Sequence, residues 1–126
     1  SQNAHVGEKN VLITVALKNN PGVTSMLLRL KYDDSALMLN KIFYNEDIGG
    51  NYVPSKYGDN PVVLYWVDGL ENKTNDWIFV TVSFDVLSTA KKGEYDLILS
   101  YDADDVFDVD EKNVHFEIIN GKIVLS

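Results

Sequence analysis

Residues 23–33 read VTSMLLRLKYD, and the alternation in this stretch indicates the fold. Successive side chains of a strand point to opposite faces, so every second residue shares a face. One face is apolar and consists of Met26, Leu28, Leu30 and Tyr32. The other face is mixed and consists of Ser25, Leu27, Arg29 and Lys31. This pattern predicts a half-buried strand in which Leu27 is the misfit on the outer face.

Short strands separated by turn signals account for the rest of the chain. The Asn-Asn-Pro-Gly sequence at residues 19–22 is such a turn, because proline fixes φ and glycine accepts a positive φ. Besides an edge strand near Val6, strands are predicted over residues 10–18, 23–33, 37–44, 62–68, 77–87, 94–102, 115–119 and 122–125. Eight or nine short strands without helical periodicity predict one all-β domain over residues 1–126, a sandwich of the jelly-roll or immunoglobulin-like kind.

The alternation also assigns a face to each side chain. From residue 37 to residue 87, the predicted core positions are Leu37, Leu39, Ile42, Phe43, Val62, Leu64, Trp66, Ile78, Val80, Val82, Phe84 and Val86. The positions predicted to point outward after residue 60 are Val63, Tyr65, Val67, Phe79, Thr81, Ser83, Asp85, Ile98 and Ser100. A contiguous apolar patch is costly to leave in water, at about 25 cal/mol per Å². Leu27 and its outward neighbours therefore predict a partner-binding surface, unless a loop or a neighbouring strand covers them.

The charge of the chain disfavours two classes of partner. Eleven basic and nineteen acidic residues give a net charge of −8. This charge argues against nucleic acid, because phosphate binding requires a basic stripe, and against anionic membranes. No run approaches the roughly 18 apolar residues of a membrane span.

The sequence contains no recognisable catalytic motif. His5 and His115 are too far apart in sequence to suggest a zinc pair, and the chain has no cysteine. A G-x-S-x-G elbow and a phosphate-binding glycine loop are both absent from the sequence. We therefore expect a protein that is not an enzyme and that holds no cofactor of its own.

An acidic segment near the C-terminus leaves alternatives open. Its carboxylates are Asp102, Asp104, Asp105, Asp108, Asp110 and Glu111. Calcium takes about six to eight oxygen ligands, which such a loop could supply. With Asp102 as the first position, however, Phe107 stands where an EF-hand requires glycine. The alternatives to calcium binding are a solvated loop and a charged rim beside a recognition surface.

The order of several motifs resembles the cohesin modules of cellulosomal scaffold and anchoring proteins, over nearly the whole chain. The motifs are the Asn-Asn-Pro-Gly turn, the strand ending in Tyr32-Asp33 with Leu37 after it, VVLYWVD at 62–68, VTVSFDVL at 80–87, the Lys92-Gly93 turn before Tyr95, and Asn120-Gly121-Lys122-Ile123-Val124. The resemblance implies a nine-stranded jelly-roll β-sandwich. It also implies a non-catalytic module that binds a dockerin module and so assembles enzymes or scaffold subunits into a cellulosome-type complex.

The resemblance further implies where the dockerin binds. In the family the dockerin packs on a flat sheet face, which residues 23–33, 62–68, 77–87 and 94–102 would form here. Carried over by register, the partner-binding residues are Ser25, Leu27, Arg29, Val63, Tyr65, Val67, Asp68, Phe79, Thr81, Ser83, Ile98 and Ser100. Tyr57 is added because it lies in the long irregular segment 46–60, and long loops often carry function.

The type and the setting of the module are also implied by the resemblance. Type I cohesins place an asparagine and an aspartate where this chain has Ser25 and Leu27, which favours another type, of ruminococcal character. The expected partner is a dockerin that itself holds calcium. We expect the module to be a monomer on its own and to act outside the cell or on a bacterial cell surface.

Three functions of other classes remain open, and one of them is a glycosidase, which would need two carboxylates that converge in a cleft. A carbohydrate-binding module on a similar sandwich would present aromatic rings as a flat stacking platform. The candidate rings are those of Tyr52, Tyr57, Tyr65 and Trp77. A plain structural module of a surface adhesin would have no partner at all.

Overall fold

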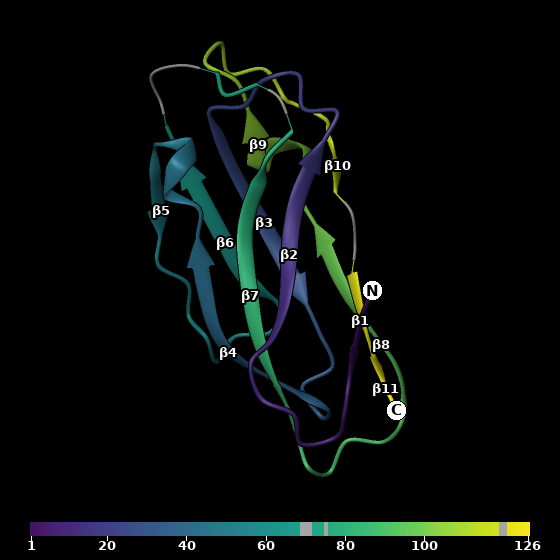
Figure 1. Ribbon diagram of the computed structural model, residues 1–126. Coiled ribbons are helices and arrows are strands. Elements are labelled where there is room, and N and C mark those ends of the chain that lie inside the picture. The colour runs from purple at the N-terminus through teal and green to yellow at the C-terminus, as the bar shows by residue number, and fades with distance from the viewer. Residues whose placement is uncertain (69–71, 75, 119–120) are drawn as a thin grey trace.

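Eleven strands and two 3-10 helices make up the computed structural model, which describes residues 1–68, 72–74, 76–118 and 121–126 (Figure 1). The helices are η1 (Glu46–Ile48) and η2 (Ala103–Asp105). The strands are β1 (Gln2–Ala4), β2 (Val11–Lys18), β3 (Ser25–Lys31), β4 (Leu37–Tyr44), β5 (Asn51–Val53), β6 (Val62–Val67), β7 (Ile78–Val86), β8 (Gly93–Ser100), β9 (Val106–Phe107), β10 (Glu117–Ile118) and β11 (Gly121–Leu125). None of the described helices is long and apolar enough to cross a membrane.

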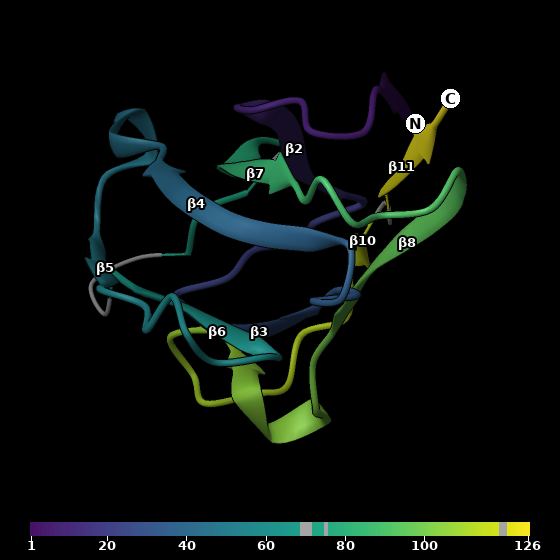
Figure 2. The ribbon, with the colours of Figure 1, turned by 90° about the horizontal axis from the view of Figure 1, so that it is seen from below.

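The strands form two facing sheets, which confirms the predicted jelly-roll β-sandwich. One sheet has the order β1-β11-β8-β3-β6-β5, with β9 also paired to β3. The other sheet has the order β10-β2-β7-β4. Viewed from below, β4, β7 and β2 form one layer, and β5, β6 and β3 form the layer opposite it (Figure 2). All neighbours are antiparallel except β1, which runs parallel to β11.

The core lies between the two layers and is filled from alternate positions of each strand. The predicted inner faces of β3 and β6 are confirmed: Met26, Leu28, Leu30, Tyr32, Val62, Leu64 and Trp66 are all buried. Burying each large apolar side chain contributes about 1.5–3 kcal/mol. Leu97 and Leu99 of β8 complete the same inner surface, with Ile98 and Ser100 pointing outward as predicted.

One predicted face in β4 is wrong because the strand carries a bulge. The pairing of β4 with β7 shifts register between Leu39 and Lys41, so Asn40 is an extra residue. Ile42 then points inward and is buried as predicted. Phe43, which was also predicted to lie in the core, points outward and is 46% exposed.

A second bulge reverses the predicted faces at the start of β7. Val80 pairs with Val15 of β2, but Ile78 pairs with the very next residue, Ala16, so Phe79 is the extra residue. The inward assignments from Val80 to Val86 are correct. Phe79 is completely buried and Ile78 is 47% exposed, which is the reverse of the prediction.

The strand count is higher than predicted because two very short strands escaped detection. β5 lies within the predicted irregular segment 46–60, and β9 lies within the acidic segment. Runs of two or three residues are too short to show alternation. The N-terminal edge strand is Gln2–Ala4, whereas Val6, where it was predicted, lies in a turn.

Asn-Gly at residues 120–121 is a turn signal that favours a hairpin between the last two predicted strands, but these strands do not pair with each other. β10 pairs with β2 and β11 pairs with β8, so the strands before and after this dipeptide belong to different sheets. The chain therefore changes layers between them. Residues 119 and 120 themselves lie outside the described residues.

Trp66 connects β6 to the loop before β5. Its Nε1 donates a hydrogen bond to the carbonyl oxygen of Gly49 at 2.9 Å. Gly50 follows with a φ of 70°, and a Cβ at this position would lie 2.6 Å from Trp66 Nε1. Only glycine fits this close contact without strain.

Gly50→Ala is expected to lower the free energy of unfolding by about 2 kcal/mol or more, since it combines a strained φ with a clash against a buried ring. Urea unfolding followed by tryptophan fluorescence measures the change. Gly58→Ala is the matched control, because no atom lies within 4 Å of its Cβ position. Equal losses from the two substitutions would contradict this account of the loop.

Tyr52 links β5 to the opposite sheet. Its hydroxyl lies 2.8 Å from the carbonyl oxygen of Phe79 in β7 and 3.0 Å from that of Asn45, so it can donate to either. Its ring packs between Tyr44 and Phe79. Burial raises the pKa of Tyr52, because the phenolate would lose its hydration.

Tyr52→Phe is expected to cost about 1 kcal/mol of stability at neutral pH through the lost hydrogen bond. The raised pKa predicts a pH effect too. The stability that it contributes is complete below the pKa of an unfolded tyrosine, about 10, and is lost as the pH rises above it. In thermal unfolding from about pH 8 to 11, the melting temperature of Tyr52→Phe should therefore fall less steeply with rising pH than that of the wild type. Parallel curves would contradict the assignment.

Candidate functional site

The outer face of the seven-stranded sheet brings together most of the predicted partner-binding residues. They occupy the positions of β3, β6 and β8 that alternate with the buried ones, and these three strands are neighbours in the order β8-β3-β6. The residues on this outer side are Ser25, Leu27, Arg29, Val63, Tyr65, Val67, Ile98 and Ser100.

An apolar row crosses this face through three paired strands. Leu27 of β3 pairs with Tyr65 of β6, and Tyr65 pairs with Val53 of β5. Val63 and Val67 lie two residues to either side of Tyr65 and share its face. Val53 and Val63 are exposed and the other three are half-buried. We call these five residues the apolar patch, and contiguous apolar exposure of this kind is typical of a protein-binding surface.

Arg29 lies beside the apolar patch, and carboxylates of the same chain neutralise its charge. Its cross-strand neighbours are Val63 and Ser100. Its Nη1 donates to Asp105 Oδ2 at 2.8 Å and lies 3.6 Å from Asp102 Oδ2. The hydrogen bond with Asp105 raises the pKa of Arg29, a side chain that is already a permanent cation. Two acids around one base leave this part of the face slightly acidic.

The acidic segment folds against the sheet instead of forming an open loop. Ser25 pairs with Phe107 of β9, which leaves Ser25 only 2% exposed. The prediction that Ser25 is accessible to a partner is therefore wrong. Figure 2 shows this segment, in yellow-green, on the outer side of the layer that contains β3 and β6.

The calcium interpretation of this segment gains no support. Within the described ranges, no three or more histidine, aspartate or glutamate side chains are grouped so that they could hold a metal ion. Asp108 Oδ1 instead accepts the backbone N–H groups of Asp110 and Lys112. Asp105 and Asp108 therefore both bind groups of the same chain.

The grouping of β7 with this face is wrong. β7 lies in the four-stranded sheet between β2 and β4. Phe79 is in the core, Ser83 is buried, and Thr81 is half-buried on the far side of the molecule. A surface formed by β8, β3 and β6 cannot include these three residues.

Asp68 and Tyr57 lie at the margins of the face. Asp68 follows β6, its Oδ2 lies 3.7 Å from Lys73 Nζ, and only 10% of its side chain is exposed. The Tyr57 hydroxyl accepts the backbone N–H of Ile42 in β4 at 3.1 Å. Tyr57 therefore lies against the edge of the opposite sheet, which separates it from the apolar patch.

Sequence reasoning missed Val53 and Asp105 as parts of this surface. Val53 belongs to a three-residue strand with no detectable alternation, and its place follows only from its pairing with Tyr65. Asp105 approaches Arg29 from 76 positions away in the sequence. A surplus of aspartates was visible, but nothing indicated which of them faces the arginine.

The aromatic platform required for carbohydrate binding is not formed by the predicted residues. Tyr52 and Trp77 pack against the core, and Trp77 lies against Trp66 at 5.6 Å between ring centroids. Tyr57 and Tyr65 belong to different parts of the surface. These four rings therefore offer no common plane to a sugar chain.

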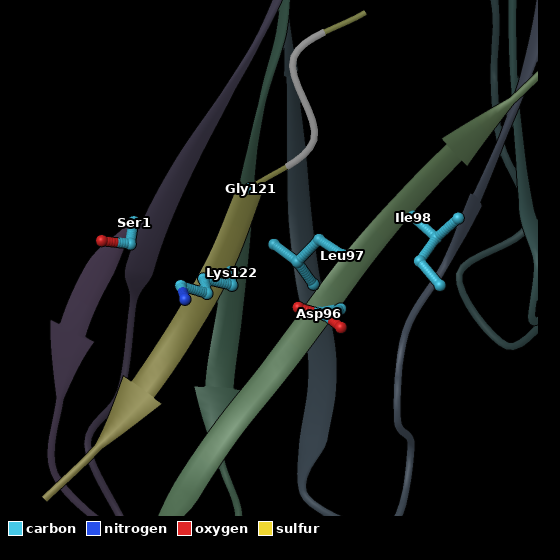
Figure 3. A pocket seen from close by; sticks show the side chains of 6 residues that line it. All are labelled: Ser1, Asp96, Leu97, Ile98, Gly121 and Lys122. Carbon is cyan, nitrogen blue, oxygen red and sulfur yellow. The ribbon is translucent and has the colours of Figure 1, made fainter.

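Two shallow hollows adjoin the face. One, of about 260 Å³, lies beside the apolar patch and is lined by Val53, Pro54, Ser55, Lys56, Asp59, Val63 and Tyr65. The other, of about 450 Å³, lies at β8 and β11, where Asp96 and Lys122 are paired neighbours (Figure 3). Its lining is polar and open, and Lys122 Nζ already lies 3.1 Å from Glu94 Oε2.

The outer face of the four-stranded sheet also exposes apolar side chains. Leu12, Met38, Phe43 and Ile78 each have between 46% and 51% of their surface exposed. Lys41 lies over the Phe43 ring at 4.9 Å from its centroid. These residues provide a natural comparison for any test of the apolar patch.

A family model of the cohesin domain matches residues 1–124. A search of curated protein sequences gave no match. Solved structures that resemble the chain include the seventh ScaB type I cohesin from Pseudobacteroides cellulosolvens, at 22% identity and a TM-score of 0.80, covering 100% of this chain and 88% of that one. A type I cohesin–dockerin complex from Clostridium thermocellum matches at 20% identity and a TM-score of 0.80, covering 100% of this chain and 94% of that one. A non-cellulosomal cohesin from the archaeon Archaeoglobus fulgidus matches at 21% and 0.79, covering 100% and 86%.

Proposed function

The chain belongs to the cohesin domain family, and we propose that it is a non-catalytic module that binds a dockerin through the outer face of β8, β3, β6 and β5. The observation that carries the proposal is the apolar patch, which continues across three paired strands. Surfaces of this kind are typical of the centre of a protein interface, where each partner buries roughly 800 Å². Tyr65, in the middle, is one of the three residue types that are enriched among the residues dominating binding energy.

The sheet itself makes the proposed surface rigid. Each residue of the patch is held by backbone pairing, and the other faces of β3 and β6 are buried in the core. A partner therefore orders few side chains when it binds, and less of the interaction energy is lost to conformational entropy. The net charge of −8 would favour a basic partner and make the association rate sensitive to salt.

The proposed setting follows the family. The neighbouring structures include cohesin–dockerin complexes, among them one from Clostridium thermocellum. We propose that this chain likewise joins a dockerin-bearing enzyme or scaffold subunit to a cellulosome-type complex, outside the cell or on a bacterial surface. The chain needs no cofactor in this role, and the dockerin holds the calcium.

We propose that the dockerin does not bind this face through the contacts that type I cohesins make. Ser25 is buried and Leu27 is apolar at the two positions where type I cohesins carry asparagine and aspartate. Of the three solved structures described above, two are type I modules, but identities of 20% and 22% support the shared fold only. A panel of dockerins of several types is therefore the appropriate probe.

Leu27→Asp and Tyr65→Ala are each expected to weaken dockerin binding by about tenfold or more, because each removes apolar contact from the centre of the patch. Isothermal titration calorimetry against the panel measures this loss. Both side chains are partly exposed, so the melting temperature should change by no more than about 3 °C.

Phe43→Ala and Ile78→Asp are matched controls, since they alter exposed apolar residues of the opposite sheet. They should leave the affinity unchanged. If the controls lose affinity while Leu27→Asp and Tyr65→Ala do not, the dockerin binds the other face. A large fall in melting temperature for Tyr65→Ala would mean that this residue stabilises the fold by packing against the core.

A further inference from the structure

Along the edge of β3 that faces β8, β3 pairs with two different strands in succession. β8 pairs with Arg29–Lys31, whereas β9 pairs with Ser25–Met26. Leu27 therefore lies at a break between two pairing strands. η2 lies in the segment that connects them, and it contacts β3, where Asp105 binds Arg29.

The carboxylate of Asp105 links η2 to β3. Asp105 Oδ2 accepts a hydrogen bond from Arg29 Nη1 at 2.8 Å and another from the backbone N–H of Asp102 at 3.4 Å. The backbone N–H of Asp105 donates to the carbonyl oxygen of Asp102 at 2.9 Å. With 24% of the Asp105 side chain and 35% of the Arg29 side chain exposed, water only partly screens the charge-assisted bond.

Asp102 is a different kind of neighbour to the same arginine. Its Oδ2 lies 3.6 Å from Arg29 Nη1, and 83% of its side chain is exposed. An exposed pair with this separation contributes little, because water and salt screen it. The chain thus offers two aspartates with the same charge and the same cation but with different geometry.

We infer that Asp105 is a positioning residue of the docking face, an inference that rests on the proposed function. By holding Arg29, it keeps the guanidinium beside the apolar patch and keeps η2 against β3. A dockerin then meets an apolar surface beside which the guanidinium of Arg29 is already paired. Without Asp105, binding would have to desolvate a less well compensated positive charge next to the patch.

Asp105→Asn tests this inference, because the amide oxygen can still accept from the backbone of Asp102 while the negative charge is lost. The dockerin Kd, measured by calorimetry against the panel, should rise about tenfold. Asp102→Asn, the matched control, should change it by less than about twofold. An unchanged Kd for Asp105→Asn, or equal losses from both variants, would overturn the inference.

A double variant separates positioning from a purely structural role. If Asp105 acts through Arg29, then Asp105→Asn should cost no further affinity in an Arg29→Gln background. If Asp105 only stabilises η2, its loss should cost the same in both backgrounds and lower the melting temperature in each. Additive losses of affinity would therefore overturn the inference.

Hydrogen exchange of the free protein gives a result that does not depend on a partner. Asp105→Asn should speed amide exchange at residues 102–105 several-fold, while Asp102→Asn should not. If the wild type binds no dockerin of the panel, the proposed function fails. The exchange experiment alone then decides whether Asp105 holds η2 against β3. Unchanged exchange in Asp105→Asn would overturn the inference in that case too.

Discussion

The register between β3 and β6 is the constraint on which both the core and the proposed docking face depend. Because side chains alternate, a slip of one residue would bring Leu27 and Arg29 into the core and expose Met26 and Leu28. Burying an arginine without compensating partners is far more costly than any gain in such a slip. The pairing of Leu28 with Leu64 fixes the register from the inside. The same pairing places Leu27 beside Tyr65 on the outside.

Much of the fold was predictable, because most strands follow a strict alternation. The inner faces of β3 and β6 and the outward positions of β6 and β8 agree with the sequence pattern. The pattern failed where one extra residue interrupts it, at Asn40 in β4 and at Phe79 in β7. A bulge depends on how two strands meet, and the sequence of one strand does not show it.

The candidate site was predictable to the extent that it lies on alternating strands. Leu27, Val63 and Tyr65 could be assigned to an outer face from local sequence, and the structure places them together. The sheet to which β7 belongs and the approach of Asp105 to Arg29 are long-range properties, and no local pattern encodes them. Ser25 was misjudged for the same reason, because a strand from residues 106–107 covers it.

Amide chemical-shift mapping of the labelled module during titration with a dockerin that it binds tests the location of the docking face most directly. The account predicts that the largest changes fall on residues 25–31, 62–67 and 93–100, with smaller ones at 51–53 and 102–107. Changes concentrated on β2, β4 and β7 would contradict it, because they would place the partner on the opposite side of the sandwich.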